Sequence, residues 1–330
     1  MHMLALRKGC DIHLPFIRCV MPHLNEDMIF GTPPEPHFNH KSLSLSAPLL
    51  EEWLTVLSEE NCRRVSSADP RQLLFRKGHA SEVIFLVCDK LRLRNDAKYI
   101  AVELFNRFMI QHVKDLYKHV CESSSRTKRK DWLGIMERVQ NQLILRILSC
   151  CQLASKLSSH YRVVTVARVQ RFLAGNGQRY TSESLLKSEL RVLKTLDFKV
   201  NVMSPLTYLE CLLEIIGHNE PGTEVKVYHG VSVKLLDLVY MKHEEIFNRL
   251  YQTATHHSSI SPADREKLAG VEADKMLLAV GIITASVFII DQGQVEKVLL
   301  ALEKISQIPQ EDIMDFCTVL VTTVAKGGMI

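Results

Sequence analysis

The first candidate for a binding residue is a lysine that closes an almost wholly apolar segment. In LSCCQLASKLSS, residues 148–159, Lys156 is the single charged residue. A cation in the last turn of a helix is favoured by the helix dipole by about 0.3–1 kcal/mol, so a purely structural role is open. The alternative is that Lys156 extends from the surface to bind a partner. The residues alone do not decide between these readings.

A second candidate is the basic cluster in SSSRTKRKDW, residues 123–132. Four cations, Arg126, Lys128, Arg129 and Lys130, occupy five positions behind three serines. One interpretation is a solvated loop, and the other is a nuclear-import or phosphate-contacting patch. Over the whole chain the net charge of +4 is mild and evenly spread, which argues against direct nucleic-acid binding.

No pattern for catalysis or for a metal is found. The nine cysteines form no CxxC pair, so we expect buried, reduced thiols. His112 and His119 lack the spacing of a metal site. Phosphate-binding loops of the GxxxxGK[ST] or GxGxxG type, GxSxG and HExxH are also missing, so we expect no enzymatic activity, no cofactor and no metal.

Residues 1–47 carry five prolines and no sustained period, which predicts a poorly ordered tail. Thr32-Pro33 in this tail is a minimal site for a proline-directed kinase, although such dipeptides are common by chance. There is no secretion signal. The longest apolar window, Met276 to Ile290, is about five residues short of a membrane span and is interpreted as a buried core helix.

From residue 48 the spacing is helical, which predicts an all-α protein. We expect a leader helix and linker over 48–75, then two five-helix units in tandem, 76–202 and 203–330, each around one helix that is apolar on every face. The fifth helix of the first unit is expected to bury Leu186, Leu190, Leu193 and Leu196, with Glu189 at the border of that stripe. Gly230 is a candidate break in the second unit.

Three segments carry a family resemblance. LRLRNDAKYIAVELFNRFM, LSCCQLASKLSS and SELRVLKTLDFKVNVMSPLTYLECLL resemble the second, third and fifth helices of the cyclin box, over roughly residues 81–213. The resemblance implies a tandem of cyclin boxes, the second more divergent. It also implies that Lys156 and Glu189 face a partner kinase and contact the backbone beside the helix that the kinase must reposition.

Several positions depart from the family pattern. Asn106 replaces the aspartate of Asp-Arg-Phe, and Ser158-Ser159 replaces the usual Glu-Glu. Val83 and Arg76 take the positions of the tryptophan and methionine of the substrate-docking patch. We therefore expect this chain to place a kinase rather than to select short Arg-x-Leu substrates.

The resemblance is strongest to a meiotic branch of the family. It implies a nuclear, non-catalytic regulator on meiotic chromosomes that promotes crossover maturation by engaging a cyclin-dependent kinase, or recombination and ubiquitin-pathway proteins. One alternative is a kinase-independent scaffold at recombination sites. A nucleic-acid-binding factor is a third reading, whose signature would be basic residues aligned along one face. No membrane partner is expected.

Overall fold

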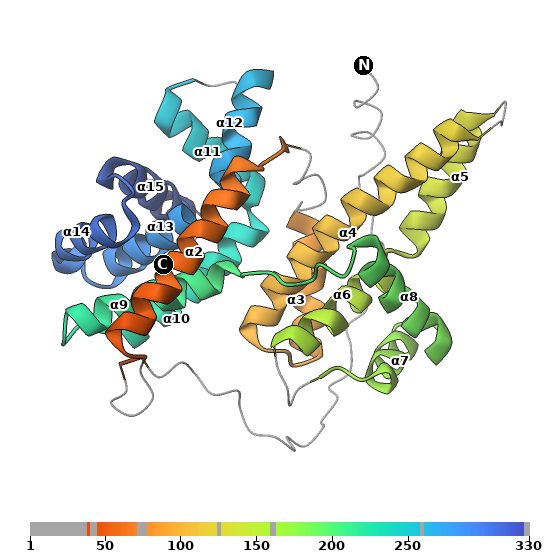
Figure 1. Ribbon diagram of the computed structural model, residues 1–330, viewed down its shortest axis with the longest axis horizontal. Helices are drawn as coiled ribbons and strands as arrows, with labels where there is room; N and C mark the ends of the chain where they lie inside the picture. Colours follow the sequence, from red (N-terminus) through yellow and green to blue (C-terminus); the bar gives the residue numbers. More distant parts are fainter. Residues whose placement is uncertain are drawn as a thin grey trace. The chain divides into compact units, whose positions relative to one another are not determined.

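The computed structural model describes residues 38–39, 45–70, 78–123, 127–158, 163–257 and 261–326. Across these residues every regular element is a helix (Figure 1), so the predicted all-α class is confirmed. The predicted phosphosite Thr32, most of the predicted tail, and Arg76 lie outside the described residues. By its internal contacts the chain divides into two units, with one boundary between Val202 and Met203 and another between Ser81 and Glu82.

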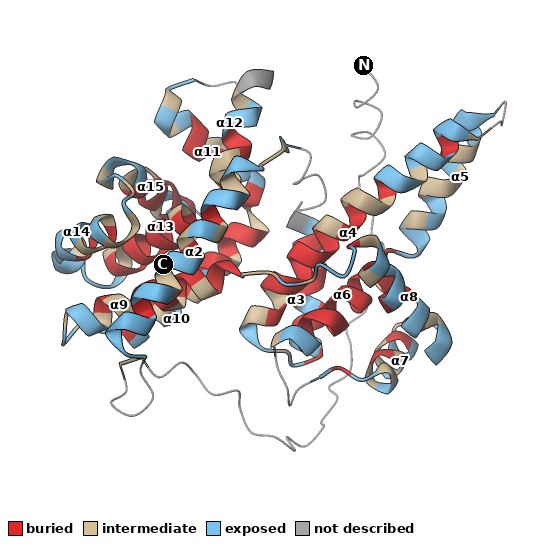
Figure 2. Cartoon of the chain, in the orientation of Figure 1, coloured by how far each residue is buried: buried red, intermediate tan, exposed pale blue. Residues whose placement is uncertain are grey.

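The first unit is built around one buried helix. The bounds of its helices are α3 (Gly78–Lys90), α4 (Asn95–Glu122), α5 (Lys128–Asn141), α6 (Leu143–Ser158), α7 (Val166–Gly175) and α8 (Ser182–Thr195). α6 is buried from Leu145 to Ser155 and packs mainly on α4 and α8 (Figure 2). The sequence predicted this enclosure, because a helix that is apolar on every face must be surrounded by other helices.

The second unit repeats this plan with more helices. They are α2 (Ala47–Ser66), α9 (Pro205–Asn219), α10 (Val225–Met241), α11 (His243–Thr255), α12 (Pro262–Ala273), α13 (Lys275–Ile290), the 3-10 turn η2 (Gln292–Gln294), α14 (Val295–Ser306) and α15 (Gln310–Lys326). α13 is the buried helix, with α9, α10, α14 and α15 packed on it. This confirms the core-helix interpretation of Met276 to Ile290.

The leader helix α2 belongs to this second unit by its contacts. Its buried Asn61 donates to Asp274 Oδ1 at 2.9 Å and accepts from the backbone N–H of Lys275 at 2.8 Å. Tyr208 donates its hydroxyl to the Leu57 carbonyl at 3.1 Å. One amide side chain therefore fixes α2 and satisfies a free N–H at the start of α13, which would otherwise be costly to bury.

Two expectations about helices were wrong, and one helix was not predicted. The basic cluster is not a loop, because Lys128, Arg129 and Lys130 form the first turn of α5, where Thr127 donates its hydroxyl to Asp131 at 3.4 Å. α12 was not predicted. The break expected at Gly230 falls instead at Lys242, between α10 and α11. A single glycine costs a helix only about 1 kcal/mol, which the burial of α10 offsets.

The expectation of evenly spread charge was also wrong. Residues 82–202 hold 22 Lys and Arg against 11 Asp and Glu, a net charge of +11, whereas residues 203–330 hold 10 against 17, a net charge of −7. The mild total of +4 is therefore the sum of a basic first unit and an acidic second one. Charge asymmetry of this size favours different partners for the two units.

Among the described residues, no single helix has both the length and the apolar composition of a membrane span. Only the bent pair 264–273 and 275–290, with an angle of 68° between its halves, passes such a test when the two are joined.

Two glycines of the second unit give a matched stability test. A Cβ at Gly281 in α13 would lie 2.6 Å from Cδ1 of the buried Phe316, whereas a Cβ at Gly230 in α10 would meet nothing within 4 Å. We expect Gly281→Ala to lower the free energy of unfolding by about 1–3 kcal/mol through overpacking. Gly230→Ala should raise it by about 0.5–1 kcal/mol through helix propensity. Urea unfolding of both variants checks this, and equal effects would contradict the packing described for α13.

Candidate partner-binding site

The end of α6 brings Lys156 from the core to the surface. The eleven residues from Leu145 to Ser155 are all buried, and Lys156 follows with a side chain 44% exposed. Ser155 donates its hydroxyl to the Gln152 carbonyl at 2.7 Å and accepts from the backbone N–H of Val164 at 3.0 Å. These bonds satisfy backbone groups near the end of α6 and fix the direction in which Lys156 leaves the core.

α8 places Glu189 beside this lysine. The helix begins at a Thr181 cap, whose hydroxyl oxygen accepts from the backbone N–H of Ser184 at 3.2 Å. The predicted core stripe was wrong by one residue in its first members: Leu185, Ser188, Glu189 and Val192 are buried, while Leu186 and Leu190 are 52% and 44% exposed. Glu189 therefore lies within the buried stripe rather than at its border.

Lys156 and Glu189 form an ion pair. The ammonium of Lys156 donates to Oε1 of Glu189, whose side chain is only 8% exposed. A carboxylate this buried would be strongly destabilising without a cation, because desolvation disfavours its charged form. The lysine therefore neutralises the carboxylate, and its remaining N–H donors are left toward solvent.

Exposed leucines flank the ion pair in sequence. Leu157 follows Lys156 and is 46% exposed, and Leu190 follows Glu189. Leu186 lies one turn before Leu190 on the same face of α8, because residues four apart are neighbours on a helix. We call Lys156, Glu189, Leu157, Leu186 and Leu190 the α6–α8 face. A cation among exposed apolar side chains is suited to docking a protein that offers backbone carbonyls and apolar residues.

A buried polar cluster joins α6 to α8 in the core beneath this face. Arg146 donates to the Ser188 hydroxyl at 2.6 Å and to Gln142 Oε1 at 2.7 Å, and its guanidinium lies 5.9 Å from the centre of the Phe108 ring. Ser149 and Ser188 share a hydrogen bond of 2.7 Å. Burial, and then the charge of Arg191, lower the pKa of Arg146. Sequence reasoning missed this cluster, although an arginine within LILRILSCC was a signal for it.

The other predicted site residues lie elsewhere in the first unit. Lys128, Arg129 and Lys130 are exposed on α5, and Arg126 lies outside the described residues. The ammonium of Lys128 donates to the Cys121 carbonyl in the last turn of α4 at 2.5 Å. This contact places a cation at the C-terminal end of α4, where the helix dipole is negative and favours it.

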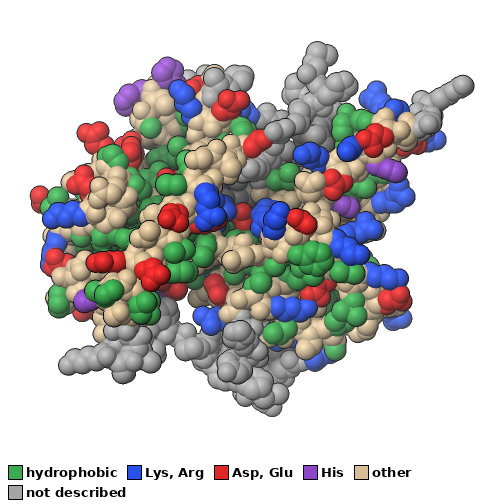
Figure 3. Space-filling model, viewed as in Figure 1, with side chains coloured by type: hydrophobic (Ala, Val, Ile, Leu, Met, Phe, Trp, Pro, Cys, Tyr) green, Lys and Arg blue, Asp and Glu red, His purple; other side chains and the backbone are tan. Residues whose placement is uncertain are grey.

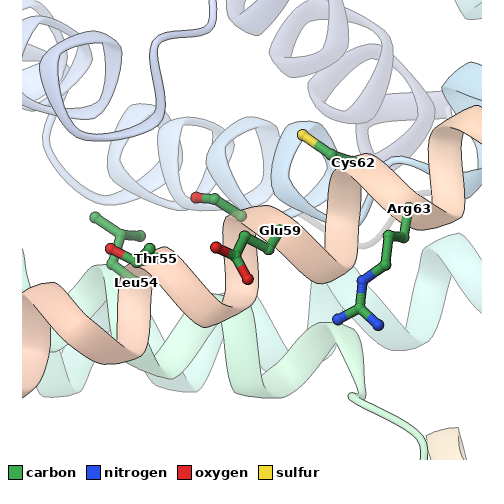
Figure 4. A pocket seen from close by; sticks show the side chains of 6 residues that line it. Leu54, Thr55, Glu59, Cys62 and Arg63 are labelled. Carbon is green, nitrogen blue, oxygen red and sulfur yellow. The ribbon is translucent and has the colours of Figure 1, made fainter.

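One surface hollow is found on α2, but it has no chemistry of its own. It is lined by Leu54, Thr55, Ser58, Glu59, Cys62 and Arg63 from successive turns of the helix (Figure 4). In the described part of the chain, no three His, Cys, Asp or Glu side chains converge on a point that could hold a metal ion.

Comparison with known proteins places the chain in a family. A model of the cyclin N-terminal domain matches residues 56–201. Cyclin N-terminal domain-containing protein 1 of Mus musculus is 37% identical over 275 residues, which cover 83% of this chain and 82% of the relative. The Homo sapiens protein of the same name is 35% identical over 275 residues and 83% of each chain. The chain belongs to the cyclin family. The family resemblance inferred from three short segments is thereby confirmed.

Two residues that depart from the cyclin pattern in our alignment are buried in the structure. Val83, at the position of the docking-patch tryptophan, is 5% exposed and so belongs to the core. Asn106, at the position of the aspartate in Asp-Arg-Phe, is likewise buried. Neither residue is available to a substrate peptide.

The histidine beside the polar cluster gives a pH test. Burial, followed by the charges of Arg146 and Arg191, lowers the pKa of His112 to about 4 against a smaller raising effect of Asp115; its ring stacks on Phe108 at 5.0 Å. The unfolded chain, with a histidine pKa of about 6.5, then binds more protons between these values, so stability falls as the pH drops from 6.5 to 4. We expect on the order of 1 kcal/mol after solvent screening.

Urea unfolding of wild type and His112→Gln at pH 7, 5.5 and 4.5 measures this contribution. The loss of stability on acidification should be smaller in the variant. His119→Gln, which changes an exposed histidine of the same helix, is the control and should keep the wild-type loss. Parallel curves for all three proteins would contradict the assignment.

Proposed function

We propose that this chain is a non-catalytic cyclin-like regulatory protein whose α6–α8 face binds a cyclin-dependent kinase. The observation that carries the proposal is the juxtaposition of Lys156 and Glu189, the two positions that the family resemblance assigns to kinase contact. Lys156 donates to a carboxylate held in the core and has further N–H groups for carbonyl oxygens of the partner. Leu157, Leu186 and Leu190 supply apolar area around it.

We further propose that the protein acts in the nucleus, on meiotic chromosomes, and promotes the maturation of recombination intermediates into crossovers. This part rests on the resemblance to the meiotic branch of the family and on the identity to cyclin N-terminal domain-containing protein 1. The buried Val83 supports a role in placing the kinase rather than in selecting cell-cycle substrates. The exposed Lys128, Arg129 and Lys130 fit a nuclear-import signal.

A kinase-independent scaffold for recombination or ubiquitin-pathway proteins is the second candidate. It is favoured by the closure of the ion pair, since Glu189 is already neutralised and nearly inaccessible. A partner that uses only the exposed leucines and Lys156 would need no acceptor from this chain. Recovery of stable non-kinase partners from germ cells, together with unchanged kinase activity in a purified mixture, would favour this alternative.

Charge and shape of the α6–α8 face can be tested separately. We expect Lys156→Ala to weaken kinase binding by about 2 kcal/mol or more, roughly thirtyfold, because it removes a desolvated donor from the interface. Because this change also leaves the buried Glu189 carboxylate unpaired, the double variant Lys156→Ala, Glu189→Gln, which has no buried charge there, is measured beside it and should weaken binding as much. Leu190→Glu should weaken binding at least as much without loss of stability, since the side chain is exposed in the free protein. Titration of immobilised kinase with the purified chain measures both.

Matched controls come from α8 itself and from α5. Lys187→Ala removes an exposed α8 cation that pairs with Glu183, and Leu133→Glu places a carboxylate at a leucine of α5 that is 63% exposed. Both should bind the kinase as wild type does. If Lys156→Ala and Leu190→Glu retain wild-type affinity while a kinase does bind, the kinase uses another surface and the proposal fails.

A further inference from the structure

α4 carries a row of cations that the proposed kinase site does not use. Arg107, Lys114 and Lys118 are spaced by seven and four residues, which places them on one face of the helix. Lys114 and Lys118 are exposed, and Arg107 is partly exposed. This is the alignment of basic residues along one face that charge counting over the whole chain had hidden.

Contacts within the first unit extend the row at both ends. At one end, Arg107 donates through Nη2 to the carbonyl of Lys199, four residues beyond the end of α8, at 2.7 Å, which brings that segment to α4. At the other end, Lys128 donates to the Cys121 carbonyl, one turn beyond Lys118. Arg129 and Lys130 follow in the first turn of α5. We call Arg107, Lys114, Lys118, Lys128, Arg129, Lys130 and Lys199 the α4–α5 basic row.

Acidic side chains neutralise this row only weakly. Lys118 pairs with Glu122 at 3.8 Å and Lys199 with Asp197 at 2.9 Å, and all four side chains are more than 60% exposed. Exposed pairs of this kind contribute about 0–1 kcal/mol and exchange readily for another anion. Within the described residues, Lys114, Arg129 and Lys130 have no ion pair. The row therefore contributes to the net charge of +11 over residues 82–202.

The row has the dimensions of a nucleic-acid backbone. From residue 107 to residue 121 the helix rises about 21 Å, which matches about six nucleotides at 3.4 Å each along one strand of duplex DNA. Lys and Arg side chains are seen on this part of the first unit, where α4, α5 and α8 lie (Figure 3). A helix keeps these cations at fixed spacing, which suits a rigid, regular row of phosphates.

We propose that the α4–α5 basic row binds the phosphate backbone of double-stranded DNA. Backbone binding is favoured over base stacking, because the aromatic side chains beside the row, Tyr117 of α4 and Trp132 of α5, are engaged with each other edge to face at 5.2 Å. The binding is expected to be independent of sequence. It revises the expectation that the chain does not contact nucleic acid, and it uses residues outside the α6–α8 face.

Fluorescence anisotropy of a labelled 20-base-pair duplex with the full chain tests this. Five or six phosphate contacts predict a plot of log K against log salt with a slope of about −5. The triple variant Lys114→Glu, Arg129→Glu, Lys130→Glu should lose at least about a hundredfold in affinity at 100 mM salt and flatten the slope by about 3. Single-stranded DNA should bind more weakly than the duplex.

The control makes the same change in net charge on the second unit. Lys226→Glu, Lys234→Glu, Lys304→Glu alters three exposed lysines there and should lose less than about threefold. Equal losses in the two triple variants, a slope near zero, or displacement of DNA by polyglutamate at the same charge concentration would overturn the proposal. Circular dichroism verifies that each variant is folded.

Two further readouts separate this inference from its rivals. The basic-row variant should bind the kinase as wild type does. The DNA-binding proposal and the kinase-binding proposal can then fail independently of each other. Sedimentation velocity at low salt tests whether the acidic second unit of another copy occupies the row instead. Self-association that the basic-row variant abolishes, without measurable DNA binding by wild type, would replace the proposal.

Discussion

The ion pair between the buried Glu189 and Lys156 constrains how two helices of the first unit pack. The Glu189 side chain is only 8% exposed, and a buried charge is costly unless it is paired. Lys156 supplies the pairing cation from the neighbouring helix. The ion pair therefore depends on how α6 and α8 pack, and their packing depends in turn on the pair. Removing either charge leaves the other helix with an uncompensated group.

The same helices bury a second charge by a different route. Arg146 is 7% exposed and is held by a hydroxyl, a side-chain amide and the face of an aromatic ring. These partners satisfy its donors but do not cancel its charge, which adds to the larger effect of burial in lowering the pKa of the nearby His112. This buried polar cluster specifies one register for α6 and α8, because a shift by one residue would leave hydrogen-bond donors in the core without acceptors.

Sequence patterns predicted the two central helices well and the amphipathic helices less well. α6 and α13 are apolar on every face, and a helix with this pattern is stable in water only when other helices surround it. In α8 the leucines at 186, 190, 193 and 196 fit the helical period as well as the true stripe does. The true stripe includes Ser188 and Glu189, and polar residues give no signal of burial until their partners on α6 are known. α5 escaped prediction because none of its described residues is buried.

The misassigned leucines and the misread charge have a common cause. Both come from averaging over a chain whose parts have different environments. Leu186 and Leu190 have the spacing of core residues, but they lie on a face of α8 that is exposed to solvent. The face that packs on α6 contains Ser188 and Glu189 instead. The net charge of +4 looks mild because a basic unit and an acidic unit cancel. Once each residue is assigned to its helix face and each charge to its unit, the first unit has two surfaces of different composition, one with exposed leucines beside Lys156 and one with a row of cations. Surfaces of such different composition fit different partners, since apolar area favours a folded protein and aligned cations favour a polyanion. Under the two proposals above, one unit holds a protein partner on one surface and a nucleic acid on the other.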